Sequence, residues 1–157
     1  MIELKKIFIS IFLIMFLSSC AGYTPIFSKK NVNFSIETIE FLGDREVKEK
    51  IDQALSGYKN KKNKEKKISL MLQNSKYSTI VSKNSKGEAQ KYKVSVQVNM
   101  KVILAENNFF EKNIEKSATY DSIESKSEEK LMENKLIEDL SNQIAQQIIF
   151  EILNNTK

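Results

Sequence analysis

The only cysteine of the chain, Cys20, follows a segment that is typical of a secretory signal. That segment carries Lys5 and Lys6 and continues as eleven almost wholly apolar residues, Ile7–Leu17. A helix needs about 20 apolar residues to span a bilayer, so this run is too short. A basic start followed by a short apolar run therefore indicates export, and a membrane anchor that stays attached is the alternative interpretation.

The four residues Leu17-Ser18-Ser19-Cys20 are typical of a bacterial lipobox, in which the cysteine thiol takes a diacylglycerol through a thioether. A single cysteine cannot form an internal disulfide, so lipid attachment is the chemistry that we predict for it. At about 0.8 kcal/mol per buried CH2, two or three acyl chains hold a protein on a membrane. We predict a removed signal peptide over residues 1–19 and a lipidated tether over residues 20–30. No cofactor is predicted apart from the diacylglycerol and acyl chain on Cys20.

The residue after the lipobox indicates to which membrane the lipoprotein is sorted. Ala21 stands where bacterial lipoproteins retained in the inner membrane usually have Asp. The similarity to bacterial lipoproteins therefore implies the cell outer membrane, with the chain lipid-anchored on the periplasmic side. An exported protein does not meet the nucleoid, so no nucleic-acid partner is expected.

The composition excludes much catalytic and metal chemistry. The 157 residues contain no His, so a Ser-His-Asp triad and a His-ligated zinc site are impossible. The net charge of +5 comes mainly from lysine, whereas recognition of bases and phosphates favours arginine, of which Arg45 is the only example. We predict no enzyme, no catalytic residue and no metal site. A hydrolase built on the carboxylates of Glu111 and Glu115 remains an alternative.

The residues after the tether predict a strand followed by a helix. Asn31–Phe41 alternates in polarity, but its apolar phase changes, which predicts a bulge near Glu37–Thr38. Asp44 is placed as a helix N-cap, and the apolar spacing that follows predicts a helix over Arg45–Tyr58.

Three further strands are predicted after this helix. Ile68–Ser82 forms the first, and the turn before the next strand ends at Gly87. The clearest alternation in the chain runs from Tyr92 to Leu104, with apolar residues on one face and lysines, amides and serine on the other. Such a strand of about fifteen residues spans roughly 50 Å. A fourth strand is predicted by the apolar positions Phe110, Ile114, Ala118 and Tyr120.

The C-terminal part predicts a long amphipathic helix. Ser125-Lys126-Ser127-Glu128 matches a capping box, and the helix is expected over Glu128–Leu153. Its apolar stripe is expected to consist of Met132, Leu136, Leu140, Ile144, Ile148 and Ile152, thickened by Leu131, Ile137, Ala145 and Ile149.

The order β-α-β-β-β-α predicts an α+β two-layer sandwich in a single domain over residues 31–157. A helix joins the first two strands, which favours a parallel pair with a right-handed crossover. The short turns between the later strands favour an antiparallel meander. We therefore predict a four-stranded mixed sheet with two helices on one face and a hydrated face opposite.

The chain resembles the LptE family of lipopolysaccharide-assembly lipoproteins. The residues that carry the resemblance are the lipobox, the adjacent Gly22-Tyr23-Thr24-Pro25-Ile26-Phe27, and the order of elements. The turn Gly87 before the long strand and Tyr120 before the last helix are also similar. The chain departs from the family pattern by Ala21, which is inserted before Gly22, and by Ile26-Phe27 in place of Leu-Tyr.

The resemblance implies a non-catalytic role with the β-barrel protein LptD. The lipoprotein would plug the barrel, assist its assembly and help lipopolysaccharide reach the outer leaflet. The resemblance also implies lipopolysaccharide binding at basic residues near the hairpin turn and before the last helix, which here are Lys86, Lys126 and Lys83. A periplasmic lipid-binding accessory lipoprotein of a transport system is the alternative, and it would need an apolar groove.

One basic segment lies outside the family pattern. Lys59–Lys67 contains six lysines and one glutamate. It is interpreted either as a solvated loop or as a patch for anionic lipid head groups or a membrane surface.

Overall fold

A computed structural model describes residues 32–62, 64–105 and 108–156 of the chain. The chain divides into two units after Asn31, and the second unit, from Val32 onward, is the one described here. The predicted signal peptide, Cys20 and the tether over residues 20–30 lie outside the described residues.

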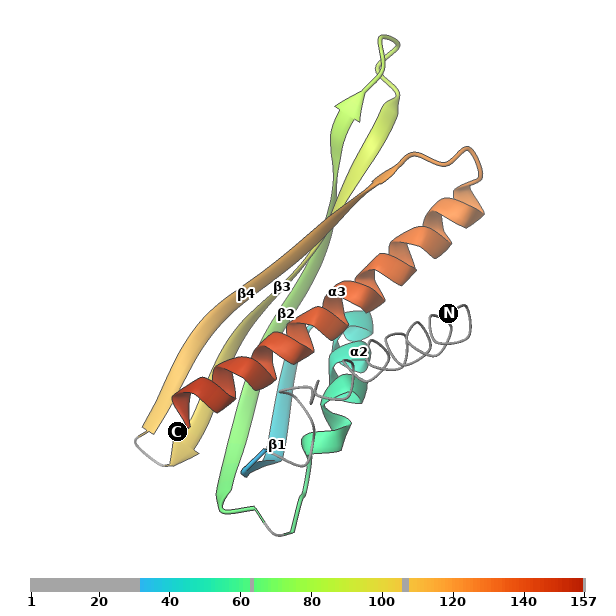
Figure 1. The fold of residues 1–157 in the computed structure, drawn as a ribbon. Coiled ribbons are helices and arrows are strands. Elements are labelled where there is room, and N and C mark those ends of the chain that lie inside the picture. Colours follow the sequence, from blue (N-terminus) through green and yellow to red (C-terminus); the bar gives the residue numbers. More distant parts are fainter. Residues whose placement is uncertain (1–31, 63, 106–107, 157) are drawn as a thin grey trace, which may run out of the picture. The chain divides into compact units, whose positions relative to one another are not determined.

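Four strands form one mixed sheet in the order β1-β2-β3-β4 (Figure 1). Their bounds are β1 Phe34–Gly43, β2 Lys66–Lys83, β3 Ala89–Ala105 and β4 Asn108–Asp121. β1 pairs parallel with β2, whereas β2 with β3 and β3 with β4 pair antiparallel. The predicted mixed sheet is confirmed, and the tip of the β2–β3 hairpin projects beyond the other elements of the described unit.

Two helices cover one face of this sheet, as predicted (Figure 1). Helix α2 (Arg45–Leu55) begins after Asp44, whose carboxylate accepts a hydrogen bond of 3.0 Å from the backbone N–H of Val47. A short 3-10 helix, η2 (Ser56–Tyr58), follows, so the α-helix ends three residues before the predicted end. Helix α3 (Lys126–Asn155) begins after Ser125, the predicted N-cap, whose hydroxyl accepts from the N–H of Glu128 at 3.4 Å.

The core lies between the sheet and the helices and is built from alternate residues of the strands. Val94, Val96, Val98, Met100 and Val102 of β3 are all buried, which confirms the alternation of the long strand. They pack in one cluster with apolar residues of the helices, namely Val47, Ile51, Leu55, Ile137, Leu140, Ile144, Ala145, Ile148, Ile149 and Ile152.

The expected apolar stripe of α3 is wrong at its N-terminal end. Leu131 is 66% exposed and Met132 is 39% exposed. The buried face of the helix passes instead through Ile137 and, one and two turns earlier, through Glu133 and Glu129. This part of α3 therefore presents carboxylates, not aliphatic side chains, on its covered side.

The link from β1 to α2 depends on a close backbone approach. The register of β1 shifts between Ile36 and Thr38, so the predicted bulge near Glu37–Thr38 is confirmed. At the end of the strand Gly43 has φ +111°, and a Cβ placed there would lie 1.9 Å from the carbonyl oxygen of Asn74. The sheet therefore requires glycine at this position.

Candidate functional site

The turn between β2 and β3 presents two of the residues that the resemblance singles out. The Asn84 side chain organises it: its oxygen accepts from the N–H groups of Lys86 and Glu88 at 2.9 Å and 3.0 Å. Its amide nitrogen donates to the carboxylate of Glu88 at 2.7 Å. This network holds the backbone in place, and the side chains of Lys83 and Lys86 are exposed around it.

The third predicted residue, Lys126, is the first residue of α3. Its ammonium lies 2.7 Å from a carboxylate oxygen of Glu129, and the hydrogen bond to Glu129 and its charge raise the pKa of Lys126. The Lys126 side chain is 79% exposed, whereas that of Glu129 is only 13% exposed. The charge of Lys126 is therefore partly neutralised by Glu129. In the described part of the chain, no acidic group lies within ion-pair distance of Lys86.

An aromatic pair whose contact the sequence does not reveal lies beside Lys126. Tyr92 of β3 and Tyr120 of β4 are opposite each other in the sheet, and their rings stack with centroids 5.4 Å apart. Burial raises the pKa of Tyr120, and the nearby charges of Glu133 and Glu129 raise it further. The alternation of both strands placed each tyrosine on the covered face, but only the strand register shows that they meet.

These residues gather at one end of the sheet. The N–H of Ser122, just after β4, donates to the carbonyl of Gln90 at 2.8 Å, which holds the approach to α3 against the base of the hairpin. A hollow of about 630 Å³ lies there, lined mainly by polar residues that include Ser82, Asn84 and Asp121. The structure therefore places Lys83, Lys86 and Lys126 at the same end of the described unit.

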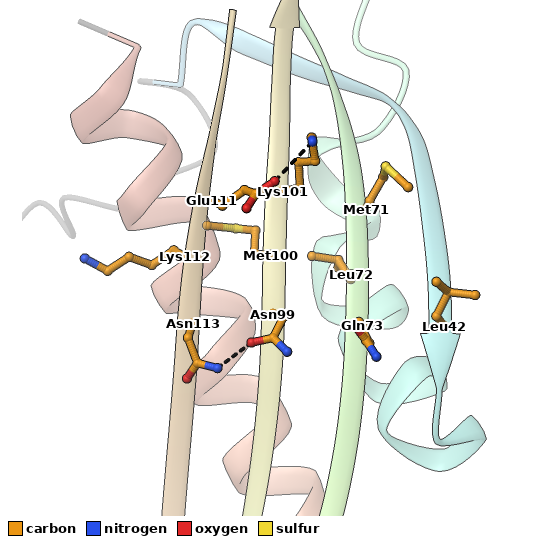
Figure 2. Close-up of a pocket in the computed structure, with 10 residues that line it drawn as sticks. All are labelled: Leu42, Met71, Leu72, Gln73, Asn99, Met100, Lys101, Glu111, Lys112 and Asn113. Atoms are coloured by element: carbon orange, nitrogen blue, oxygen red, sulfur yellow. Dashed lines mark hydrogen bonds and ion pairs between the residues drawn. The ribbon is translucent and has the colours of Figure 1, made fainter.

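The face of the sheet that the helices leave open is polar, and its charges are matched between strands. Lys101 of β3 pairs with Glu111 of β4 at 3.1 Å, and Lys91 pairs with Asp121 at 3.4 Å. Figure 2 shows the Lys101–Glu111 pair and, along the same strands, the hydrogen bond from the amide of Asn113 to the side-chain oxygen of Asn99. Such cross-strand pairs leave little net charge on this face.

A depression of about 450 Å³ on this face mixes apolar and polar side chains (Figure 2). Leu42 and Met71 project into it beside Gln73, Asn99 and Lys101. Apolar groups contribute the larger part of its surface, and the side-chain amides and the Lys101 ammonium lie among them.

The carboxylates considered for hydrolysis are separated on this face. Glu111 and Glu115 lie four residues apart on β4, which corresponds to about 13 Å along a strand. Glu111 pairs with Lys101, and Glu115 accepts a hydrogen bond of 2.6 Å from the hydroxyl of Tyr77. The two therefore lack the closer, facing arrangement of a carboxylate pair that cleaves glycosidic bonds.

No cluster of three or more His, Cys, Asp or Glu side chains suited to a metal ion occurs in residues 32–62, 64–105 and 108–156. Within the same residues, none of the helices combines the length and the apolar character required to cross a membrane.

The two-layer sandwich of the described unit is similar in fold to several lipoproteins of known structure. One similar structure is rare lipoprotein B from Shewanella oneidensis, which has 15% sequence identity and a TM-score of 0.57. The match covers 77% of this chain and 100% of that chain. A minor lipoprotein from Acinetobacter baumannii has 14% sequence identity and a TM-score of 0.55, and the match covers 76% of this chain and 92% of that chain. Lipoprotein B from Nitrosomonas europaea has 15% sequence identity and a TM-score of 0.52, and the match covers 75% of this chain and 83% of that chain. At these identities the similarity establishes the fold.

The family is established by the sequence itself. The family described as "LptE: Lipopolysaccharide-assembly" matches residues 32–152, which is most of the chain. The chain belongs to the LptE family, as the resemblance in the sequence indicated. No match was found among curated proteins.

Proposed function

We propose that this chain is an outer-membrane lipoprotein, anchored through acyl chains on Cys20 on the periplasmic side. It assists assembly of the β-barrel LptD, plugs that barrel and helps deliver lipopolysaccharide to the outer leaflet. It needs no cofactor and no catalysis of its own. Membership in a lipopolysaccharide-assembly family supports this proposal, and the dimensions and polarity of the described unit support the specific role.

The observation that carries the proposal is the length of the β2–β3 hairpin. β2 runs from Lys66 to Lys83, a distance of about 55 Å at 3.3 Å per residue. A bilayer with its head groups is about 40–45 Å thick. Inside a barrel, a body of this length reaches from the periplasmic side to the outer leaflet, and Lys83 and Lys86 lie at the far end of it.

The open face suits the inside of a barrel. Barrel lumens are polar, so a plug must present polar surface without a large unbalanced charge. The pairs Lys101–Glu111 and Lys91–Asp121 and the Asn99–Asn113 hydrogen bond meet that requirement.

The basic end suits the phosphates of lipopolysaccharide. Lysine binds phosphate as a point charge, so exposed ammonium groups on a fixed backbone are sufficient. Lys86 and Lys83 satisfy this at the turn, where Asn84 fixes the backbone. Lys126 contributes less, because its ammonium already pairs with Glu129.

Co-purification tests the partner. The tagged mature chain is recovered from outer-membrane extract, and its stable partner is identified by mass spectrometry. We expect a large β-barrel protein, and its absence from the recovered complex would refute the role as a plug. Recovery of a transport complex in its place would support the accessory lipoprotein instead.

Two further tests address the anchor and the lipid. With Cys20→Ala we expect the protein to leave the membrane fraction, and unchanged fractionation would rule out the anchor. With Lys86→Glu and Lys126→Glu together we expect weaker binding to purified lipopolysaccharide, whereas wild-type affinity would remove these residues as candidates. Lys112→Glu and Lys135→Glu together are the matched control, because they change the net charge equally and both lysines are exposed on other parts of the domain.

A further inference from the structure

The opposite end of the described unit carries the lysine loop, defined here as residues 59–67. Three contacts with β1 fix its start. Lys59 forms an isolated parallel bridge with Ile36, and the N–H of Asn60, which has φ +50°, donates to the carbonyl of Ile36 at 3.0 Å. The N–H of Lys61 donates to the buried hydroxyl of Ser35 at 2.7 Å. The loop therefore holds its lysines at a defined place beside the start of β1.

Half of the lysines of this loop have partners within the chain. Lys59 pairs with Asp52 of α2 at 2.5 Å, and Lys67 pairs with Glu37 at 2.8 Å. The ammonium of Lys66 donates to the carbonyl of Thr156. These three side chains are held against the domain.

The other three lysines, Lys61, Lys62 and Lys64, have no such partners among the described residues. In the described part of the chain, no carboxylate lies within ion-pair distance of any of them. The acid of the loop, Glu65, accepts a hydrogen bond of 2.7 Å from the side-chain amide of Asn33. Lys61 and Lys62 are exposed and Lys64 is half-buried. Three closely spaced positive charges thus remain on a loop whose two ends are held by β1 and Asn33, which favours an anionic partner.

The position of the lysine loop in the fold favours a membrane surface as that partner. Asn33 lies next to the loop, since its carbonyl accepts from the N–H of Lys66 at 3.4 Å. Cys20 precedes Val32 by twelve residues, so the chain between them spans at most about 43 Å. Lys83, at the other end of β2, lies about 55 Å further along the strand. Acyl chains on Cys20 would therefore keep the lysine loop near the bilayer.

We propose that Lys61, Lys62 and Lys64 bind the anionic head groups of the leaflet that holds the acyl chains of Cys20. The inference rests on the lipid attachment within the proposed function, and it adds a second membrane contact on the folded domain. Each lysine near an anionic surface strengthens binding roughly fivefold, so three contribute on the order of 100-fold. Because this attraction is screened within a Debye length of about 8 Å at physiological salt, it decreases as salt is raised.

Vesicle flotation tests the contact without the anchor. The mature chain carrying Cys20→Ser is produced without lipid, so that only contacts made by its side chains are measured. It is mixed with vesicles of phosphatidylcholine alone or with phosphatidylglycerol added. We expect salt-sensitive binding only to vesicles that contain phosphatidylglycerol.

The decisive comparison is between two triple charge reversals. Lys61→Glu/Lys62→Glu/Lys64→Glu should reduce vesicle affinity on the order of 100-fold or more. Lys48→Glu/Lys112→Glu/Lys135→Glu has the same net charge, changes exposed lysines elsewhere, and should bind much more tightly than the loop variant. Equal affinities of the two variants, or no binding by the unlipidated wild type, would overturn the proposal.

Two controls separate this result from other failures. Far-ultraviolet circular dichroism checks that both variants are folded, and Lys61→Gln/Lys62→Gln/Lys64→Gln replaces the loop variant if the acidic version unfolds. The flotation assay uses a protein without acyl chains and contains no LptD, so its outcome is independent of fractionation of the Cys20→Ala protein and of recovery of the barrel. Failure of the proposed function and failure of this inference are therefore observed separately.

Discussion

Alanine at Gly43 should destabilise the protein far more than alanine at Gly87, although both glycines have positive φ. Their φ angles are +111° and +84°. An L-residue in such a conformation costs roughly 1–2 kcal/mol, and the stiffer unfolded chain returns about 0.4–1 kcal/mol. Because nothing lies within 4 Å of a Cβ at Gly87, this backbone balance is the whole cost there, and Gly87→Ala should cost about 1 kcal/mol.

At Gly43 a steric cost is added. A Cβ would lie 1.9 Å from the carbonyl oxygen and 2.9 Å from the carbonyl carbon of Asn74, which are backbone atoms and cannot rotate away. The end of β1 must separate from β2, and the hydrogen bond from the N–H of Asp44 to Asn74 is lost. The backbone cost of about 1 kcal/mol, about 1 kcal/mol for the lost hydrogen bond and roughly 1–3 kcal/mol for the forced backbone shift give a total of roughly 3–5 kcal/mol.

Urea unfolding of the mature chain, followed by circular dichroism, measures both variants under the same conditions. We expect a large decrease in the midpoint for Gly43→Ala and a small one for Gly87→Ala. Because stability of small domains is about 5–15 kcal/mol, the larger loss should be clearly visible. Equal losses for the two variants would refute the argument that the close approach to Asn74, and not φ alone, requires Gly43.

Three further predictions concern a partly buried ion pair, the N-cap of α3 and the buried face of that helix. Burial lowers the pKa of Lys76, but the hydrogen bond to Glu46 and nearby carboxylate charges outweigh it and raise the pKa. The stabilisation from Lys76 should therefore be complete below about pH 10.4, the pKa of lysine in the unfolded chain, and disappear as pH rises through the folded pKa. The urea midpoints of wild type and Lys76→Met should then converge at high pH, and a difference that stays constant with pH would contradict this. Ser125→Ala should cost about 0.5–1 kcal/mol in urea unfolding, because α3 loses its cap, and no loss would show that the cap contributes nothing. Ile144→Ala should cost about 2–5 kcal/mol because the side chain is fully buried, whereas exposed Leu131→Ala should stay within about 0.5 kcal/mol; similar losses in thermal unfolding would contradict the observed rotation of α3.

Local patterns predicted most of the fold because each depends on neighbouring residues. The alternation from Tyr92 to Leu104 follows from the two-residue period of a strand, and the caps at Asp44 and Ser125 need only a side-chain oxygen near a free N–H. The phase change after Ile36 was sufficient to locate the bulge in β1. Such signals survive in a single sequence because they do not depend on the rest of the chain.

Contacts between residues far apart in the sequence could not be predicted from local patterns. The pairing of Tyr92 with Tyr120 depends on strand register, and the ion pair of Lys50 with Glu138 joins residues 88 positions apart. Contacts of this kind join positions whose meeting depends on long-range packing, so spacing along the chain does not reveal them.

The sequence by itself determined the order of the elements and the lysine-rich segment, and it predicted the lipobox with Cys20, because each signal lies in consecutive or periodic residues. Only the tertiary structure decided which charges are free. It paired Lys59 with Asp52 and Lys67 with Glu37, and it left Lys61, Lys62 and Lys64 without such partners in the described part of the chain. It also turned Leu131 outward. The physical reason is that the charge or apolar surface that a side chain presents depends on what packs against it, which only the three-dimensional arrangement of strands and helices sets.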